Sequence, residues 1–191
     1  MAKRLGSGRR EELLDGVMRM ISERGFADVR IADIAEELHC SVATLYKIAP
    51  NKDSLLVLAI RRWGDVALAR AEDAARSANT PTDRARRYYL SVAESLVPQT
   101  RAFRFDMERF ESTSQAHAAL IDRFTDRFVQ LLNEAVDAGE VCPMNTRFFA
   151  HLFQQMALVV RDQHVLMEDG ITAAEAMVQV DAMIWDGIRR R

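Results

Sequence analysis

The sequence of 191 residues has few of the residues that cross-link or interrupt a chain, with two cysteines, four prolines and eight glycines. Two cysteines cannot form the disulfide framework of a small secreted domain, and they fit a reduced cytosolic compartment. So little proline and glycine leaves few turns for an all-β chain of many short strands. Apolar runs such as residues 55–60 are far shorter than the roughly 20 residues of a membrane span. The N-terminus is basic but leads into no apolar stretch, so we expect no secretory signal. We therefore expect a soluble, cytoplasmic protein without a membrane partner.

Charge is distributed unevenly along a chain of otherwise ordinary globular composition, 49% hydrophobic and 28% charged. Residues 1–62 carry a net charge of +2, and residues 63–191 a net charge of −4. Four cations and no acids lie in the first ten residues: Lys3, Arg4, Arg9 and Arg10. A basic end on an acidic protein suggests an anionic partner for that end, and the alternative is a solvated tail without contacts.

Apolar residues recur at steps of three and four along nearly the whole chain, as in Leu13, Val17 and Ile21. Residues of N-cap type, among them Asn51, Thr80 and Thr172, precede several of these stripes. Two pairs, Ser112 with Gln115 and Thr172 with Glu175, have the spacing of a capping box at the start of a helix. No alternating strand pattern and no internal repeat is present in the sequence. The pattern predicts an all-α protein of about nine helices, over residues 13–25, 31–38, 41–47, 51–77, 80–98, 101–111, 112–139, 145–168 and 172–188.

The eighth predicted helix is apolar on more than one face, through Phe148, Phe149, Leu152, Phe153, Met156, Ala157, Val159 and Val160. A surface helix needs one apolar stripe, so this helix is expected to be buried on two sides. One side meets its own domain, and the other fits a second subunit, with the ninth helix beside it in a two-fold packing. A central helix inside a monomer is the alternative.

Residues 33–46 have the build of a helix-turn-helix, with Ile34, Ala35 and Leu38 on the apolar face of the first helix. Ser41 is placed to cap the second helix, and Leu45 points back to the core. The outward positions are then Val42, Ala43, Thr44 and Lys47. Small outward residues allow a short helix to approach base edges in the major groove, so this segment predicts DNA binding.

From Leu13 to Leu56 the chain resembles the TetR family of transcriptional regulators. The resemblance rests on Gly25-Phe26, Asp33-Ile34-Ala35, Ser41, Thr44-Leu45-Tyr46 and Lys52. It implies an N-terminal helix-turn-helix DNA-binding domain, residues 1–50, and a helical effector-binding and dimerisation domain, residues 51–191. It further implies a homodimer formed through the last two helices, an operator in double-stranded DNA and repression as the default action.

The chain departs from the family pattern at three places. The turn glycine is His39, which tolerates positive φ better than most residues. The capping Thr or Ser before the second helix is Arg30, and a common His-Phe pair is Ile48-Ala49. The resemblance assigns a DNA-backbone contact to that His and an anchoring role to that Phe. Arg30 and Lys47 are expected to replace the phosphate contact.

The resemblance gives each DNA-binding residue a role. Tyr46 and Lys52 are expected to contact phosphates, and the basic N-terminal residues to follow the backbone or enter a minor groove. Val42, Ala43 and Thr44 are the base-facing set, with Thr44 able to hydrogen-bond. Because no Arg, Asn or Gln projects from the third helix, shape and backbone contacts should carry more of the specificity. The DNA-binding set is Arg30, Ser41, Val42, Ala43, Thr44, Tyr46, Lys47 and Lys52.

The resemblance also implies an effector cavity bounded by the fourth to eighth predicted helices. Its candidate lining is rich in aromatic residues and Met, which favours a mostly apolar small molecule. The candidates are Tyr88, Phe103, Met107, Phe110, Phe124, Phe128, His151 and Gln155.

Signatures of an enzyme are missing from the sequence. The four histidines lack ligand partners at zinc-binding spacing, and there is no glycine-rich phosphate loop or nucleophile elbow. We expect no catalytic residues, no metal and no cofactor. The rival to a regulator is a helical protein-interaction module that has lost specific DNA binding through Ile48 and Ala49.

Overall fold

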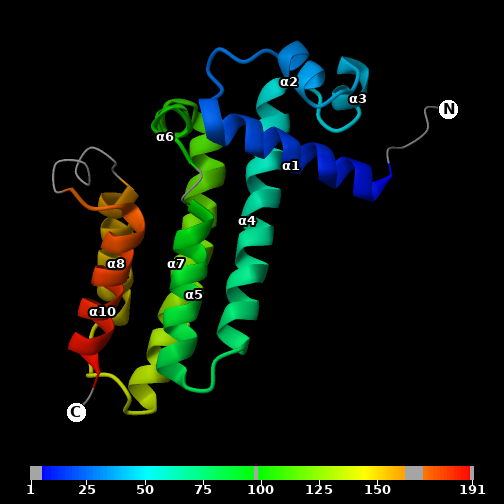
Figure 1. Cartoon of the computed structure of the whole chain (residues 1–191). Helices are drawn as coiled ribbons and strands as arrows, with labels where there is room; N and C mark the ends of the chain where they lie inside the picture. Colours follow the sequence, from blue (N-terminus) through cyan, green and yellow to red (C-terminus); the bar gives the residue numbers. More distant parts are fainter. Residues whose placement is uncertain (1–5, 97–98, 162–169, 190–191) are drawn as a thin grey trace. The chain divides into compact units, whose positions relative to one another are not determined.

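The computed structural model of the chain describes residues 6–96, 99–161 and 170–189, and the side chains of residues 157–161, 173, 174 and 177 lie outside this description. These residues form nine helices and, apart from an isolated bridge between Val141 and Arg189, no strand (Figure 1). The all-α prediction is confirmed. The helices are α1 (Ser7–Arg24), α2 (Ile31–Glu37), α3 (Val42–Tyr46), α4 (Lys52–Arg76), α5 (Pro81–Leu96), α6 (Arg101–Arg109), α7 (Glu111–Asp137), α8 (Thr146–Arg161) and α10 (Ala173–Ile188).

The chain divides into two compact units. Unit 1 comprises Met1–Leu68 and Pro98–Asp122, and unit 2 comprises Ala69–Val97 and Arg123–Arg191. The functional boundary expected at residue 50 stays a prediction. In the structure, the part of α4 up to Leu68 and all of α6 belong with the helix-turn-helix, because both elements pack on the core of that unit.

Unit 1 is built around the apolar face of α1. Its predicted stripe is buried, with Val17 and Ile21 fully enclosed, and it shares one core with Ile34, Leu45 and residues of α4 and α6. Phe26, in the loop after α1, packs between the rings of Phe103 and Phe110 at centroid distances of 6.1 and 5.5 Å. The α1–α2 loop is thereby held against α6.

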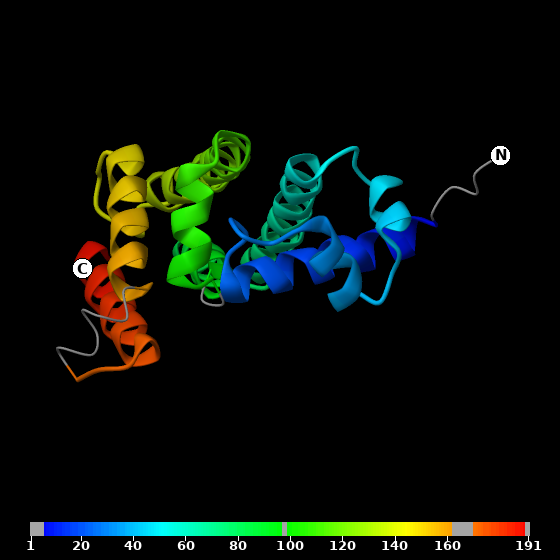
Figure 2. The same cartoon turned by 90° about the horizontal axis from the view of Figure 1, so that it is seen from above.

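Unit 2 is a helical bundle with an aromatic centre. Tyr89 of α5, Phe128 of α7 and Trp185 of α10 surround Phe153 of α8, with centroids at 4.7, 5.1 and 5.6 Å from its ring. Helices α8 and α10 pack side by side, as both views show (Figures 1 and 2). Burial raises the pKa of Tyr89 to about 12, with the nearby charge of Asp181 acting in the same direction.

Several helix boundaries follow the predicted caps. The side chains of Asn51, Thr80 and Thr172 accept hydrogen bonds from backbone N–H groups three residues further on, at 2.8, 3.1 and 3.2 Å. Glu175 completes the predicted capping box by accepting from the Thr172 N–H at 2.8 Å. These local signals therefore place the starts of α4, α5 and α10.

Two helices, α1 and α7, start at other residues than predicted. Helix α1 begins at Ser7, ahead of the first residue of its apolar stripe. The capping box predicted at Ser112 and Gln115 was wrong, because α7 begins at Glu111. Phe110 is extended, and its carbonyl accepts from the N–H of Ser114 and the hydroxyl of Thr113, both at 2.9 Å. Phe110 thus occupies the cap position.

The eighth helix was predicted to reach about residue 168, but residues 162–169 lie outside the described part of the chain, as do the side chains of Ala157, Val159 and Val160. None of the helices within the described ranges is long and apolar enough to cross a membrane.

A capping contact in unit 2 makes the first testable prediction. The Glu140 carboxylate accepts from the Thr82 N–H at the start of α5, at 2.9 Å, and this bond lowers the pKa of Glu140. A lowered folded-state pKa stabilises the fold above the unfolded value, about 4.3, and this stabilisation is lost as pH falls through the folded value. Glu140→Gln is therefore expected to cost about 0.5 kcal/mol at pH 7, since solvent screens a surface group. The difference in thermal midpoint between parent and variant should vanish between pH 4.5 and 3, roughly the range where the carboxyl titrates. A difference that persists at pH 3 would contradict it.

Candidate nucleic-acid interface

The turn between α2 and α3 is formed by residues 38–41. His39 has a φ of 49°, and it is the one non-glycine residue with positive φ in the described ranges. The prediction that His39 takes the conformation of the usual turn glycine is confirmed. Ser41 caps α3, its hydroxyl accepting from the Thr44 N–H at 3.1 Å. His39 and Ser41 thus form a tight turn from the end of α2 to the start of α3.

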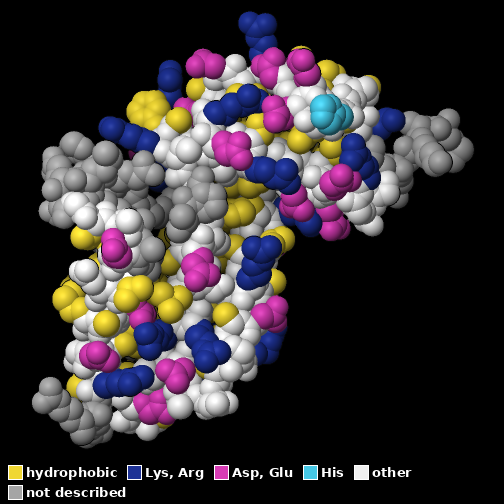
Figure 3. All heavy atoms as spheres, in the orientation of Figure 1, with side chains coloured by type: hydrophobic (Ala, Val, Ile, Leu, Met, Phe, Trp, Pro, Cys, Tyr) yellow, Lys and Arg dark blue, Asp and Glu magenta, His cyan; other side chains and the backbone are white. Residues whose placement is uncertain are grey.

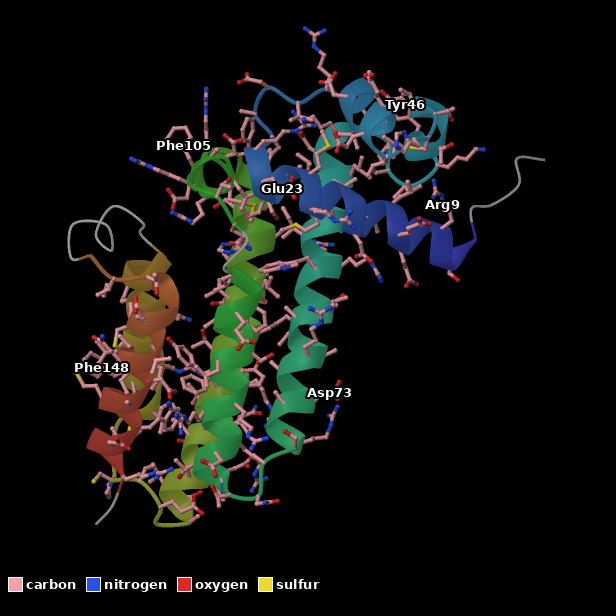
Figure 4. The ribbon with its side chains drawn as sticks, in the orientation of Figure 1. Arg9, Glu23, Tyr46, Asp73, Phe105 and Phe148 are labelled. Atoms are coloured by element: carbon pink, nitrogen blue, oxygen red, sulfur yellow. The ribbon has the colours of Figure 1, made fainter. Side chains whose placement is uncertain are left out.

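Helix α3 presents small and polar side chains outward. Leu45 is fully buried, whereas Ala43, Tyr46 and Lys47 are exposed and Val42 and Thr44 are half-buried. Tyr46 has 51% of its surface exposed and projects from the unit 1 surface (Figure 4). An exposed tyrosine on a five-residue helix leaves its hydroxyl available to a partner.

The hydroxyl of Thr44 already has a neighbour in the protein. It lies 2.8 Å from the Ser41 hydroxyl, and either oxygen can be the donor. Each hydroxyl carries one proton and two acceptor sites, so the pair retains hydrogen-bonding capacity toward a base or phosphate. The pair also fixes the rotamers of both side chains.

Ile48 and Ala49 are both buried in the core of unit 1. These two residues, at which the sequence departs from the family pattern, therefore pack inside the protein. The N–H of Arg30, just before α2, is bound by the Asp33 carboxylate at 2.7 Å, while the Arg30 side chain is exposed. A side chain three residues into the helix replaces one arm of the missing cap.

The basic N-terminal residues are only partly described. Lys3 and Arg4 lie outside the described residues. Arg9 is exposed and forms an ion pair with Glu12 at 2.8 Å, within the first turns of α1.

Lys52, the last of the predicted DNA contacts, is bonded within the protein. Its ammonium donates to the carbonyl oxygens of Phe26 at 2.6 Å and Ala27 at 3.2 Å. It is the first residue of α4 and is half-buried. The structure thus joins the start of α4 to the α1–α2 loop.

The comparisons with known proteins concern this same segment. Residues 13–59 match the model of a family described as bacterial regulatory proteins, tetR family. The transcriptional repressor KstR of Mycolicibacterium smegmatis is 34% identical over 76 residues, which are 40% of this chain. The matched segment spans 37% of the length of that relative. This segment belongs to the TetR family.

Beyond the TetR-family segment, solved structures resemble the whole chain in fold. A TetR-family regulator from Rhodococcus sp. covers 95% of this chain and 99% of its own, with a TM-score of 0.80 and 20% identity. A regulator from Saccharomonospora viridis in complex with choline covers 97% and 100%, with a TM-score of 0.78 and 20% identity. At this identity the likeness shows the fold alone. The family that residues 13–59 match is one of regulatory proteins.

One residue that was not predicted from the sequence also binds the α1–α2 loop. Asp106 of α6 is buried, and its Oδ2 accepts from the N–H groups of Phe26 at 2.6 Å and Ala27 at 2.8 Å. The signal in the sequence was a lone acid inside the apolar face of a predicted helix. An unpaired acid seldom occupies such a position, since a buried carboxylate requires donors.

A surface cavity of about 440 Å³ opens beside this loop, entirely within unit 1. Its lining includes Arg24, Asp28 and Asp33 together with Phe105, which has 62% of its surface exposed. Of the predicted effector residues, Phe103 and Met107 belong to the core of unit 1, and the partly buried Phe110 packs against that core.

The remaining predicted effector residues lie in unit 2. Tyr88, Phe124 and Phe128 are buried, whereas His151 and Gln155 are exposed on α8. Burial and the charge of Glu72 raise the pKa of Tyr88. Its hydroxyl and the indole N–H of Trp185 are buried, and neither has a hydrogen-bond partner among the described residues. The structure therefore does not gather the eight candidates into one site.

Within the described residues, no three side chains of His, Cys, Asp or Glu are grouped as metal ligands. Cys40, in the turn, has its pKa raised by burial, with Arg9 acting in the opposite direction, so its thiol is a poor nucleophile.

Proposed function

We propose that the chain is a cytoplasmic, homodimeric regulator that binds an operator in double-stranded DNA and represses transcription until a small effector releases it. The observation that carries the proposal is the outward face of α3 behind its Ser41 cap. There Ala43 is small, and Tyr46 and Lys47 are exposed and polar. This face lies inside the segment that matches the family model.

The proposed contacts divide into two kinds. Tyr46, Lys47 and Arg30 bind phosphates, because they are exposed and carry a hydroxyl or a cation. Ala43, Val42 and Thr44 approach base edges, where the first two offer apolar contact to a thymine methyl group. Few direct contacts to bases follow from this set, so DNA shape should contribute much of the specificity.

Exposed apolar side chains on α8 and α10 support a dimer formed through these helices. Phe148 on α8 is 59% exposed, and Val178 and Met183 on α10 are 69% and 70% exposed. Hydrophobic side chains gather over these two helices (Figure 3). A contiguous apolar surface of this kind is typical of a subunit interface.

The effector is proposed to bind in unit 2, near Tyr88 and Phe128. Both side chains are buried, and the hydroxyl of Tyr88 lacks a hydrogen-bond partner in the described part of the chain. A buried hydroxyl without a partner, among apolar side chains, is the environment expected for an apolar ligand that bears one or more hydrogen-bonding atoms. The similar regulator from Saccharomonospora viridis was solved in complex with choline, a small molecule. Helix α4 begins in unit 1 and ends in unit 2, so it is a covalent route by which occupancy reaches the DNA-binding unit.

The test is selection of genomic DNA fragments by the purified full chain at 50 and 200 mM salt. A dimeric regulator recovers a two-fold symmetric site, and its affinity falls steeply with salt because phosphate contacts release counterions. Recovery without any preferred site would favour the interaction-module alternative. Ile48 and Ala49 are buried in the core, so their replacement of the family residues is compatible with the packing of unit 1.

Tyr46→Phe is expected to weaken binding to the selected site by about tenfold, because each half-site loses a hydrogen bond to a charged phosphate. Fluorescence anisotropy with the selected duplex measures the change. Tyr89→Phe is the matched control, since it removes a hydroxyl that bonds to the Phe153 carbonyl inside unit 2. Equal affinities of Tyr46→Phe and the parent protein would remove Tyr46 from the interface.

A further inference from the structure

The peptide group between Phe26 and Ala27 is held at both ends by opposite charges. Its carbonyl, that of Phe26, accepts from the Lys52 ammonium at 2.6 Å. Its N–H, that of Ala27, donates to the Asp106 carboxylate at 2.8 Å. An anion on the N–H and a cation on the carbonyl polarise the group in the same sense, so each hydrogen bond strengthens the other.

Each charge also holds a second group of the same loop. Asp106 accepts from the Phe26 N–H at 2.6 Å, and Lys52 donates to the Ala27 carbonyl at 3.2 Å. We call these two side chains, with the four backbone groups of Phe26 and Ala27, the loop clamp. Gly25 allows the Asp106 carboxylate to lie this close to the loop, because a Cβ at residue 25 would lie 2.6 Å from Asp106 Oδ2.

The two side chains of the clamp, Asp106 on α6 and Lys52 on α4, lie on helices that are themselves held in place within unit 1. Thr100, the N-cap of α6, binds the Ser22 carbonyl near the end of α1 through both its N–H and its hydroxyl, each at 2.9 Å. Lys52 is the first residue of α4, and Leu55 and Leu56 next to it are buried in the core. The clamp therefore joins α1, α4 and α6 at the loop that leads into α2.

We propose that Lys52 and Asp106 are positioning residues for DNA binding, which orient the helix-turn-helix through the loop clamp, and that Lys52 does not contact a phosphate. The inference rests on the proposed function, because it concerns the same DNA-binding surface. A loop held at Phe26 and Ala27 fixes where α2 begins, and α3 follows α2 through the tight turn at His39. Two of the three N–H donors of the half-buried Lys52 ammonium are held by these carbonyls, which fixes the group in the clamp.

Salt dependence separates positioning from phosphate contact. A lysine that neutralises a phosphate makes the plot of log K against log salt shallower by about one unit when it is removed, or about two in a dimer. A positioning residue lowers the fraction of molecules in the binding-competent state, which lowers affinity and leaves that slope unchanged. Asp106 is an acid, so a loss of affinity on its replacement cannot come from a lost phosphate contact.

The experiment measures binding of the full chain to the selected duplex between 50 and 300 mM salt for Lys52→Met, Asp106→Asn and the double variant. Each single variant is expected to bind roughly tenfold more weakly with an unchanged slope, because the competent fraction falls. The double variant should bind much less than a hundredfold more weakly, since either change alone opens the clamp. Lys47→Met is the matched control for a phosphate contact and should make the slope shallower. Glu108→Gln, an exposed acid on the same helix, should bind like the parent protein.

Amide hydrogen exchange tests the clamp without DNA. The Ala27 amide should exchange faster in Asp106→Asn and also in Lys52→Met, although Lys52 binds no N–H of the loop. If Asp106→Asn does not fold, the salt dependence of DNA binding and the exchange of the Ala27 amide are both measured on Lys52→Met. A shallower slope for Lys52→Met, or parent-like affinity of Asp106→Asn, overturns the inference while the proposed function stands. A parent protein that binds no duplex refutes the proposed function, and the inference with it.

Discussion

Replacing Phe153 by alanine is expected to lower the free energy of unfolding by about 3–5 kcal/mol, the range typical of a buried Phe-to-Ala change. Phe153 has 1% of its surface exposed, and its ring contacts those of Tyr89, Phe128 and Trp185 from three other helices. A fourth ring, Phe149 on the same helix, lies at 6.1 Å. The substitution removes the centre of the aromatic cluster and leaves a cavity that rigid neighbours can fill only in part.

Denaturant unfolding of parent and variant at one fixed protomer concentration measures the loss, because the stability of a dimer depends on concentration. Phe105→Ala is the matched control, since this phenylalanine is 62% exposed on α6 and should cost less than about 0.5 kcal/mol. A loss below about 1 kcal/mol for Phe153→Ala would mean that unit 2 repacks freely at its centre.

Local features of the fold could be predicted from the sequence because they depend on residues a few positions apart. The stripe of α1, the caps at Asn51, Thr80, Ser41 and Thr172, and the positive φ of His39 all have this property. The start of α7 is equally local, but Phe110 lacks an N-cap side chain, so the sequence pattern favoured a cap two residues later. In the structure Thr113 and Ser114 bind the Phe110 carbonyl instead.

The partners of the predicted DNA-binding residues could not be obtained from spacing. Lys52 binds carbonyls 25 and 26 positions away, and Asp106 binds N–H groups 79 and 80 positions away. Periodicity shows which face of a helix is apolar, but it does not show which loop approaches that face. The resemblance therefore named Lys52 as a phosphate contact, and only its surroundings in three dimensions point to a different role.

The same limit explains the dispersion of the predicted effector residues. Phe103 and Met107 belong to the core of unit 1, Phe110 packs against that core, and Tyr88 and Phe128 belong to unit 2. An apolar stripe has the same appearance in the sequence whether it fills a core or lines a cavity. His151 and Gln155 are exposed on α8, a helix that is apolar on more than one side, so the sequence did not define its outward face.

Replacing Phe148 by aspartate is expected to convert the proposed dimer into monomers and to weaken operator binding by at least about a hundredfold, because two linked half-site readers gain avidity of this order. A two-fold interface brings the substitution in twice, so each dimer would bury two new charges in an apolar contact. Phe148 is 59% exposed and projects from α8 (Figure 4), so the fold of a single chain should tolerate the change.

Phe105→Asp separates loss of the dimer from a general effect of adding charge. Phe105 is 62% exposed, nearly the same as Phe148, but it lies on α6 in unit 1. Sedimentation velocity should show a dimer for the parent and for Phe105→Asp, and a monomer for Phe148→Asp. The thermal midpoint of isolated Phe148→Asp should no longer depend on protein concentration, since its unfolding is no longer linked to dissociation. A Phe148→Asp protein that remains dimeric would place the subunit contact away from this part of α8, and the exposed residues of α10, Val178 and Met183, would become the next positions to test.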